Sequence, residues 1–147
     1  MLSAVEALEQ RIVDEGIFVT EHKYLPKCLD GLFCKHQDDK IICLRSHMSA
    51  RRRLCTLAEE YGHVVTSWGD ARNMAPSEMT RQEARAIAFA IELVVPLKKL
   101  FKARNAGVHN AYECAEYLGV TEEFLTWVVA FYEARVPGFR TMFMNHE

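Results

Sequence analysis

Apolar residues recur every three or four positions in two stretches of the chain, which is the spacing of one helix face. The first stretch covers residues 2–15, and Gly16 follows at the point where a helix would end. The second covers residues 50–67, with Ser49 as a candidate N-cap. The apolar positions are Val5, Leu8 and Ile12 in the first stretch, and Leu54, Leu57, Tyr61 and Val64 in the second. Both stretches are therefore predicted to be amphipathic helices.

Between these helices the apolar runs are short and rich in residues that favour strands. They cover residues 17–20, 31–34 and 40–44, and Pro26 and the polar turn 37–39 separate them. The pattern predicts two or three antiparallel strands.

The second half of the chain is helical in pattern. Residues 69–77 are predicted to form a loop, and Thr80 with Glu83 forms a capping-box pattern that opens a long helix toward Lys102. Pro96 is expected to bend or break this helix, because proline lacks the backbone N–H that a helix interior needs.

Gly107 marks a turn, after which residues 110–137 divide into two helices at Gly119, with Thr121 as the N-cap of the second. Residues 138–147 are expected to be a loosely held tail. The order of helix, small sheet and helices indicates an α+β fold. We expect a core over residues 1–105, a helical segment over 106–137 and the tail after it.

Composition narrows the function classes. The chain has 147 residues, half of them hydrophobic, and a formal net charge of −2, which gives no general attraction to nucleic acid or anionic membranes. The longest apolar run, residues 87–97, contains Glu92 and Pro96 and is too short to span a bilayer. Five cysteines without C-x-x-C spacing, and no secretory signal, favour reduced thiols in a cytoplasmic protein.

The residues with candidate chemistry lie on the second predicted helix. Residues 59–63 read Glu-Glu-Tyr-Gly-His, which is the zinc-protease motif H-E-x-x-H with a glutamate in place of the first histidine. Positions four apart share a helix face, so Glu59 and His63 can point at one ion. Glu60 then stands where the motif has its general base. A carboxylate can replace the histidine because its oxygen also binds zinc, at about 2.0–2.2 Å.

A third ligand is needed, and the candidate is Glu83 in the following helix. Two carboxylates would surround the ion with more negative charge than a two-histidine site does, which should weaken its Lewis acidity. The alternative interpretation is that two adjacent glutamates form a solvated helix face. The remaining histidines lack ligand spacing and are expected to be surface or packing residues: His22, His36, His47, His109 and His146.

Three separated blocks resemble the ImmA/IrrE family of metallopeptidases, in a phage and mobile-element branch with E-E-x-G-H in place of H-E-x-G-H. The first is LPKCLDGLF followed by a hairpin and LCTLAEEYGHVVTSWGD; the second is EARAIAFAIELVVP; the third is YECAEYLGVTEEFL. The resemblance covers roughly residues 25–132. The resemblance implies a zincin-like helical core, in which the motif helix packs on a small antiparallel sheet and a second helix delivers Glu83.

Carried over by position, the resemblance implies that Glu60 is the catalytic residue and that His63 and Glu83 bind the metal. The family's first metal histidine falls on Glu59, and Ile87 replaces the asparagine usual in the second block. Members of the family cleave repressor-type regulators. The resemblance therefore implies a zinc endopeptidase whose substrate or partner is a helix-turn-helix repressor of a phage or mobile element. The alternative is an inactive relative that binds this partner without cutting it.

Residues 115–125 have the small residue, glycine turn and apolar anchors of a helix-turn-helix. Phosphate contacts need Lys and Arg, whereas this region is acidic. Its glutamates are Glu113, Glu116, Glu122, Glu123 and Glu133, with Arg135 as the balancing cation. We expect a protein-docking or packing role here, with no direct binding of nucleic acid.

Overall fold

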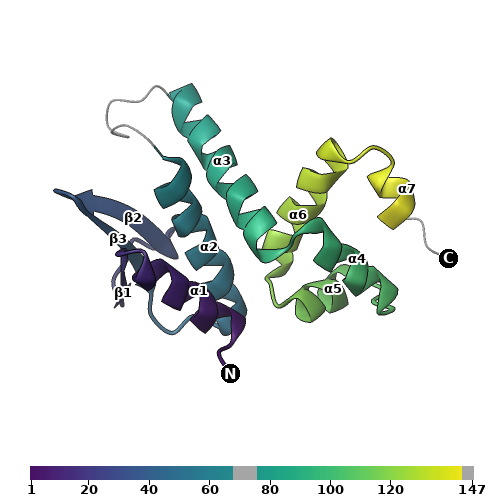
Figure 1. The fold of residues 1–147 in the computed structure, drawn as a ribbon, viewed down its shortest axis with the longest axis horizontal. Coiled ribbons are helices and arrows are strands. Elements are labelled where there is room, and N and C mark those ends of the chain that lie inside the picture. Colours follow the sequence, from purple (N-terminus) through teal and green to yellow (C-terminus); the bar gives the residue numbers. More distant parts are fainter. Residues whose placement is uncertain (68–75, 144–147) are drawn as a thin grey trace. The chain divides into compact units, whose positions relative to one another are not determined.

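The computed structural model describes residues 1–67 and 76–143 (Figure 1). The chain divides into two compact units, Met1–Ala90 and Ile91–Glu147. The division falls inside the helix of residues 76–94, whereas the sequence predicted a boundary after residue 105. The elements are α1 (Ala4–Asp14), β1 (Phe18–His22), β2 (Gly31–His36), β3 (Asp39–Arg45), α2 (Ala50–Thr66), α3 (Pro76–Val94), α4 (Leu97–Asn105), α5 (Ala111–Leu118), α6 (Glu122–Arg135) and α7 (Phe139–Phe143). The α+β class predicted from the sequence is confirmed.

The helices predicted over residues 2–15 and 50–67 both form, as α1 and α2, and each has a side-chain cap. Ser3 and Glu6 make a reciprocal capping box at the start of α1, and Gly16 has a φ of 86° beyond its end. Ser49 caps α2 by accepting a hydrogen bond from the Arg52 N–H. The apolar face predicted for α2 is buried against the rest of the unit.

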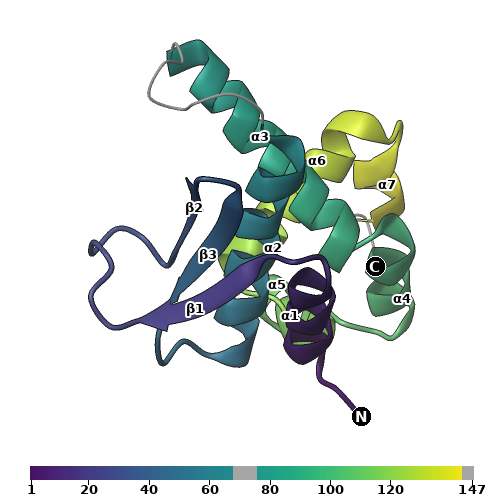
Figure 2. The ribbon, with the colours of Figure 1, turned by 60° about the vertical axis from the view of Figure 1, so that its left-hand side comes forward.

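The sheet has the order β1-β3-β2, so β3 is the central strand (Figure 2). The hairpin β2–β3 is antiparallel, as predicted, but β1 pairs with β3 in parallel. The expectation of a wholly antiparallel sheet is therefore wrong for β1. The chain reverses twice between β1 and β3, and β3 inserts beside β1, so the two strands run in the same direction.

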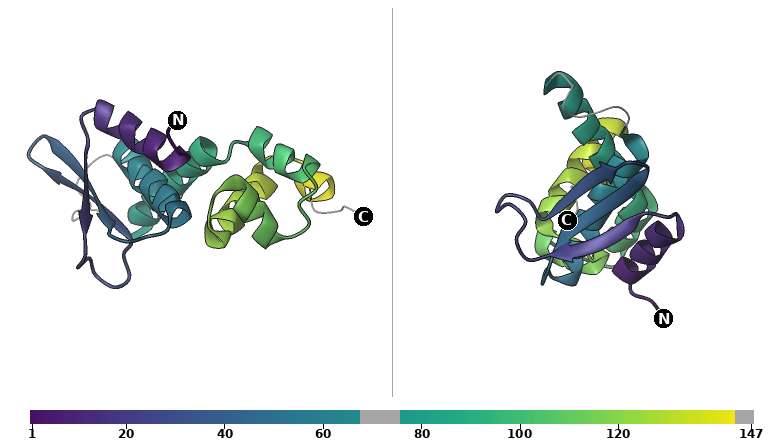
Figure 3. Two further views of the ribbon diagram at one scale, coloured as in Figure 1. Left: turned by 90° about the horizontal axis from the view of Figure 1, so that it is seen from below. Right: turned by 90° about the vertical axis from the view of Figure 1, so that its left-hand side faces the viewer.

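One face of the sheet packs on α2, and the right-hand view of Figure 3 looks onto the opposite face. Ile42 and Leu44 of β3 are fully buried on the helix side, as are Leu57 and Ala58 of α2. Arg53 of α2 forms ion pairs with Glu9 of α1 and with Glu21 of β1. The motif helix is thus fixed on two sides.

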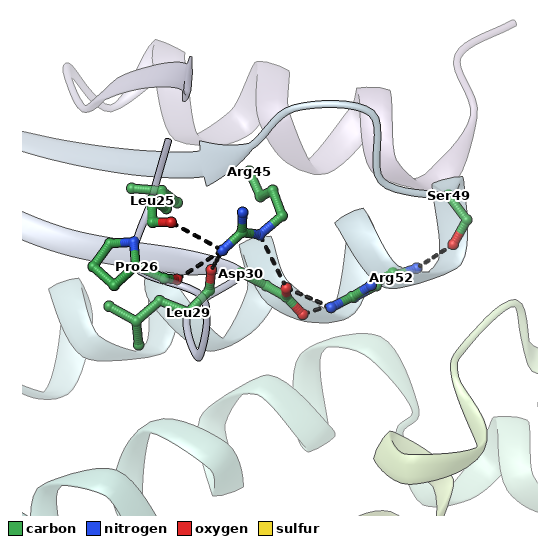
Figure 4. Close-up of polar contacts among 7 residues, drawn as sticks. All are labelled: Leu25, Pro26, Leu29, Asp30, Arg45, Ser49 and Arg52. Atoms are coloured by element: carbon green, nitrogen blue, oxygen red, sulfur yellow. Dashed lines mark hydrogen bonds and ion pairs between the residues drawn. The ribbon is translucent and has the colours of Figure 1, made fainter. Parts of the chain in front are cut away.

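The loop between β1 and β2 is held by one arginine (Figure 4). The Arg45 guanidinium donates to the carbonyls of Leu25, Pro26 and Leu29, at 3.3, 2.7 and 2.6 Å. It also lies 3.6 Å from the Asp30 carboxylate, which accepts two hydrogen bonds from Arg52, at 2.7 and 2.5 Å. Asp30 directly precedes β2, so these contacts tie the start of that strand to β3 and α2.

The helix predicted to begin at Thr80 begins earlier, at Pro76. This corrects both the capping-box prediction and the last part of the predicted loop 69–77, whose residues 69–75 lie outside the described part. Proline is favoured in the first turn of a helix, because its missing N–H would have no partner there. The predicted break near Pro96 is confirmed: α3 ends at Val94, and α4 begins after that proline.

In the second unit α5 ends at Gly119, which has a φ of 73°, and Thr121 caps α6, as predicted. The segment expected to be a loose tail instead starts with α7, where Phe139 is buried. This correction follows from apolar burial, since Phe139 stacks on Phe143. Across residues 1–67 and 76–143, no helix is long and apolar enough to cross a membrane.

Candidate metal centre

Three side chains with metal-binding atoms meet between α2 and α3. Glu59, His63 and Glu83 each offer one ligand atom, and these atoms all lie within 4.8 Å of one another. The Nε2 atom of His63 is 3.4 Å from a carboxylate oxygen of Glu83. The convergence predicted from the helical spacing is therefore present.

Close packing of two helix backbones brings Glu83 to this point. A Cβ atom built on Gly62 would lie 2.4 Å from the Ala86 carbonyl oxygen. Gly62 lies between the two α2 ligands in the sequence, and Ala86 lies one turn beyond Glu83. The rings of Tyr61 and Phe89 also pack edge to face in this helix interface, with their centroids 5.5 Å apart. A residue without a side chain at position 62 thus permits the spacing on which the cluster depends.

Glu60 belongs to the neighbouring face of α2, which packs on β2. Burial raises the pKa of Glu60 to about 8, and the carboxylates of Glu59 and Glu83 act in the same direction. A hydrogen bond from the Phe33 backbone acts in the opposite direction. This carboxyl group is therefore poised to exchange a proton near neutral pH, beside the cluster.

Gly31 permits the close approach of β2 to this face. A Cβ atom at Gly31 would lie 2.7 Å from the methyl carbon of Thr56 and 3.0 Å from Cγ of Glu60. Thr56 and Glu60 are four positions apart, so both point at the strand. The glycine that opens β2 and the backbone of Phe33 therefore both lie against the Glu60 side chain.

The donor set fits a divalent transition metal. Carboxylate oxygen and imidazole nitrogen both bind zinc, at about 2.0–2.2 Å, and tetrahedral ligands at such distances are about 3.4 Å apart. The separation of His63 and Glu83 already has this value. The Glu83 side chain is 57% exposed, so the cluster is open to solvent on that side. The three residues would also leave the fourth tetrahedral position for water or substrate, which a catalytic zinc site needs and a purely structural site lacks.

The sequence indicated the four polar residues of this candidate centre, which are Glu59, Glu60, His63 and Glu83. It did not indicate the residues of the sheet that pack or hydrogen-bond around them. Gly31 has a recognisable signal, because a glycine within a strand often marks a close approach. The Phe33 backbone has none, since its role depends on where β2 lies relative to α2. Arg45 also has none, because its partners are backbone carbonyls of a loop.

Comparisons with known proteins agree with this geometry. Residues 14–126 match the peptidase M78 family model, described as the IrrE N-terminal-like domain. A solved structure titled Mycobacterium tuberculosis transcriptional regulator has a similar fold, with a TM-score of 0.69 and 16% sequence identity. The alignment covers 88% of this chain and 42% of that one, so this chain spans less than half of that protein's length. No curated protein matches the chain.

Proposed function

Because the chain belongs to the IrrE N-terminal-like family of metallopeptidases, we propose that it is a cytoplasmic, metal-dependent endopeptidase that cleaves a repressor-like regulatory protein of a phage or mobile element. Glu59, His63 and Glu83 hold the cation, which we propose to be zinc, and Glu60 is the general base. The observation that carries this proposal is the convergence of three ligand atoms within 4.8 Å beside a buried carboxyl group.

A cation bound by these three residues would supply a Lewis acid that polarises a water molecule and the peptide carbonyl. In its ionised form, Glu60 would take a proton from the attacking water and later deliver it to the leaving amine. Its hydrogen bond from the Phe33 backbone orients the carboxyl group for both transfers. The ligands Glu59 and His63 lie on the same rigid helix as this base, which fixes their relative positions.

The proposed substrate, a helix-turn-helix repressor, rests on the resemblance of the three sequence blocks to the phage and mobile-element branch of the family. The exposure of Glu83 is compatible with a protein substrate, because a polypeptide needs an open site. Fold likeness alone does not select a substrate.

A second candidate function is favoured by one residue. Glu59 replaces a neutral imidazole with a carboxylate, which weakens the Lewis acidity of a bound cation. On this alternative the chain binds the same regulator without cutting it. The two functions differ in whether the protein binds a metal and cleaves its partner.

The test uses the full chain purified without added metal. Bound metals are identified and quantified by inductively coupled plasma mass spectrometry. In a separate assay, the protein is incubated with a co-encoded helix-turn-helix repressor. We expect near-stoichiometric zinc and one specific cut. Glu60→Gln should abolish cleavage and keep the metal, because it removes the base and no ligand; His63→Ala should lose both.

The control is Glu116→Gln, which removes an exposed carboxylate of α5 and should change neither result. Cleavage that persists in Glu60→Gln would show that the assigned mechanism is wrong. Absence of metal and cleavage in the unchanged protein, with both gained in Glu59→His, would favour the binding module.

A further inference from the structure

Two thiols lie together on the face of the sheet that points away from α2. In the β2–β3 pairing Leu32 is opposite Cys43 and Cys34 is opposite Ile41, so the two cysteines are diagonal neighbours. The burial pattern places them on the outer face, because the alternate residues Ile42 and Leu44 are the buried ones. The thiols are joined by a side-chain hydrogen bond.

The two positions differ in access and in freedom to move. Cys34 is exposed and lies on β2, an edge strand. Cys43 is half-buried on the central strand, where its sulfur accepts a hydrogen bond from the Thr20 hydroxyl at 3.6 Å. An oxidant from solvent therefore reaches Cys34 first, and Cys43 is held where it can respond.

We propose that Cys34 and Cys43 are a modification site, which hydroperoxides convert into a reversible disulfide that shifts β2 along β3. With hydrogen peroxide, the Cys34 sulfur attacks one peroxide oxygen, the O–O bond breaks and water leaves, which gives a sulfenic acid; an organic hydroperoxide would release an alcohol instead. The Cys43 sulfur then displaces the hydroxyl group as a second water, and the S–S bond forms. In total, two electrons and two thiol protons pass to the peroxide. Small thiols reverse the bond by exchange.

The shift follows from the dimensions of a disulfide. Diagonal partners on neighbouring strands have Cβ atoms somewhat less than about 7–8 Å apart, whereas a disulfide needs about 3.8 Å. The edge strand must therefore move toward Cys43, and a disulfide formed with such strain is readily reduced. Although Cys34 is exposed, partial desolvation of its sulfur and the neighbouring Cys43 raise the pKa of the thiol, so only a small thiolate fraction reacts near neutral pH. The pair thus responds to sustained oxidant.

A shift of β2 would act on the metal centre through the backbone of Phe33. Phe33 lies between Leu32 and Cys34 on β2, and its backbone hydrogen-bonds to Glu60. Displacement of the strand changes this hydrogen bond. The disulfide itself does not depend on the proposed peptidase activity, so the two proposals succeed or fail separately.

The experiment treats the reduced full chain with hydrogen peroxide, blocks the remaining thiols and maps tryptic peptides by mass. We expect a loss of about 2 Da and a cross-link between peptides 28–35 and 41–45, both reversed by dithiothreitol. Because peptide 28–35 also contains Cys28, the matched control is Cys28→Ser, which removes an exposed loop thiol and should keep the cross-link. Cys34→Ser and Cys43→Ser should each abolish it.

Several results would overturn the proposal. They are a bond from Cys28 to Cys43, dimers linked between chains, or oxidation of Cys34 to sulfonic acid without a cross-link. Nuclear magnetic resonance of the oxidised protein supplies the second readout, independent of the variants. The Phe33 amide resonance should shift, whereas that of Lys98 in the second unit should not; a cross-link without the Phe33 shift would contradict the strand movement.

Discussion

Gly62→Ala tests whether close packing of α2 and α3 assembles the metal centre. The added Cβ atom would lie 2.4 Å from the Ala86 carbonyl oxygen, 3.0 Å from its carbon and 3.1 Å from its Cα. Ordinary contact between carbon and a carbonyl oxygen is about 3.3–3.6 Å, so the helices must separate by about 1 Å. Both partners are backbone or Cβ atoms, and no change of rotamer relieves the overlap.

Two opposing contributions set the size of the effect. Replacing a glycine inside a helix with alanine ordinarily stabilises by about 0.5–1 kcal/mol. Overpacking a tight contact costs about 1–3 kcal/mol. We therefore expect the free energy of unfolding to fall by about 1–2 kcal/mol, and the melting temperature to fall by several degrees for about 150 residues. The sign is the test, because helix propensity alone predicts a gain.

The same separation carries Glu83 away from the α2 ligands. A shift of about 1 Å exceeds the tolerance of a metal site, which requires ligands placed within about 0.5 Å. We expect zinc affinity to fall by about 10–100-fold, the range seen when the support of a ligand is removed. Affinity is measured by competition with a chromogenic chelator, and stability by thermal unfolding followed by circular dichroism.

The control is Val65→Ala, which truncates an exposed residue of α2. It should leave zinc affinity unchanged and should stabilise slightly, since alanine favours helix over valine. If Gly62→Ala melts at or above the temperature of the unchanged protein and binds zinc equally well, the helix contact does not position Glu83.

Three further predictions concern the elements around the centre. Arg45→Met should lower the free energy of unfolding by about 2 kcal/mol in urea titrations, because it leaves three loop carbonyls without their charged donor. Gly31→Ala should lower the melting temperature, and Thr56→Ser in the same chain should restore part of the loss, because the Thr56 methyl group is the nearest atom to the added Cβ. In the metal-free protein the pKa of Glu60 rises from 4.5 to about 8, so between these values the folded state binds a proton that the unfolded chain releases. Stability should therefore fall as pH rises through this window, and urea unfolding of Glu60→Gln should show a flatter dependence.

Local rules predicted the helices that carry the centre. The apolar spacing and Ser49 located α2, and positions four apart placed Glu59 and His63 on one face. Glu83 needed a different source, since nothing local indicates which residue of the next helix faces α2. The match of the second sequence block provided it.

What local rules missed depends on distant contacts. The direction of β1 is set by where β3 inserts, after two reversals of the chain. The start of α3 was misplaced because Thr80 and Glu83 form a capping-box pattern, yet the helix passes through both residues. Phe139 looked like part of a tail because its aromatic partner, Phe143, gives no periodic pattern over so short a segment.

The position of Glu59 bears on whether the centre still binds a metal or has lost it. A carboxylate that had merely replaced a lost ligand could point to solvent, as glutamates on helices commonly do. Here its ligand atom remains with those of His63 and Glu83, within 4.8 Å. At so short a distance the carboxylates of Glu59 and Glu83 would repel each other. They would also repel the ionised form of Glu60, whose pKa they raise. A bound cation removes this repulsion, because one divalent charge offsets both ligands. The retained cluster therefore supports a metal site with a changed donor more strongly than a site that has lost its metal.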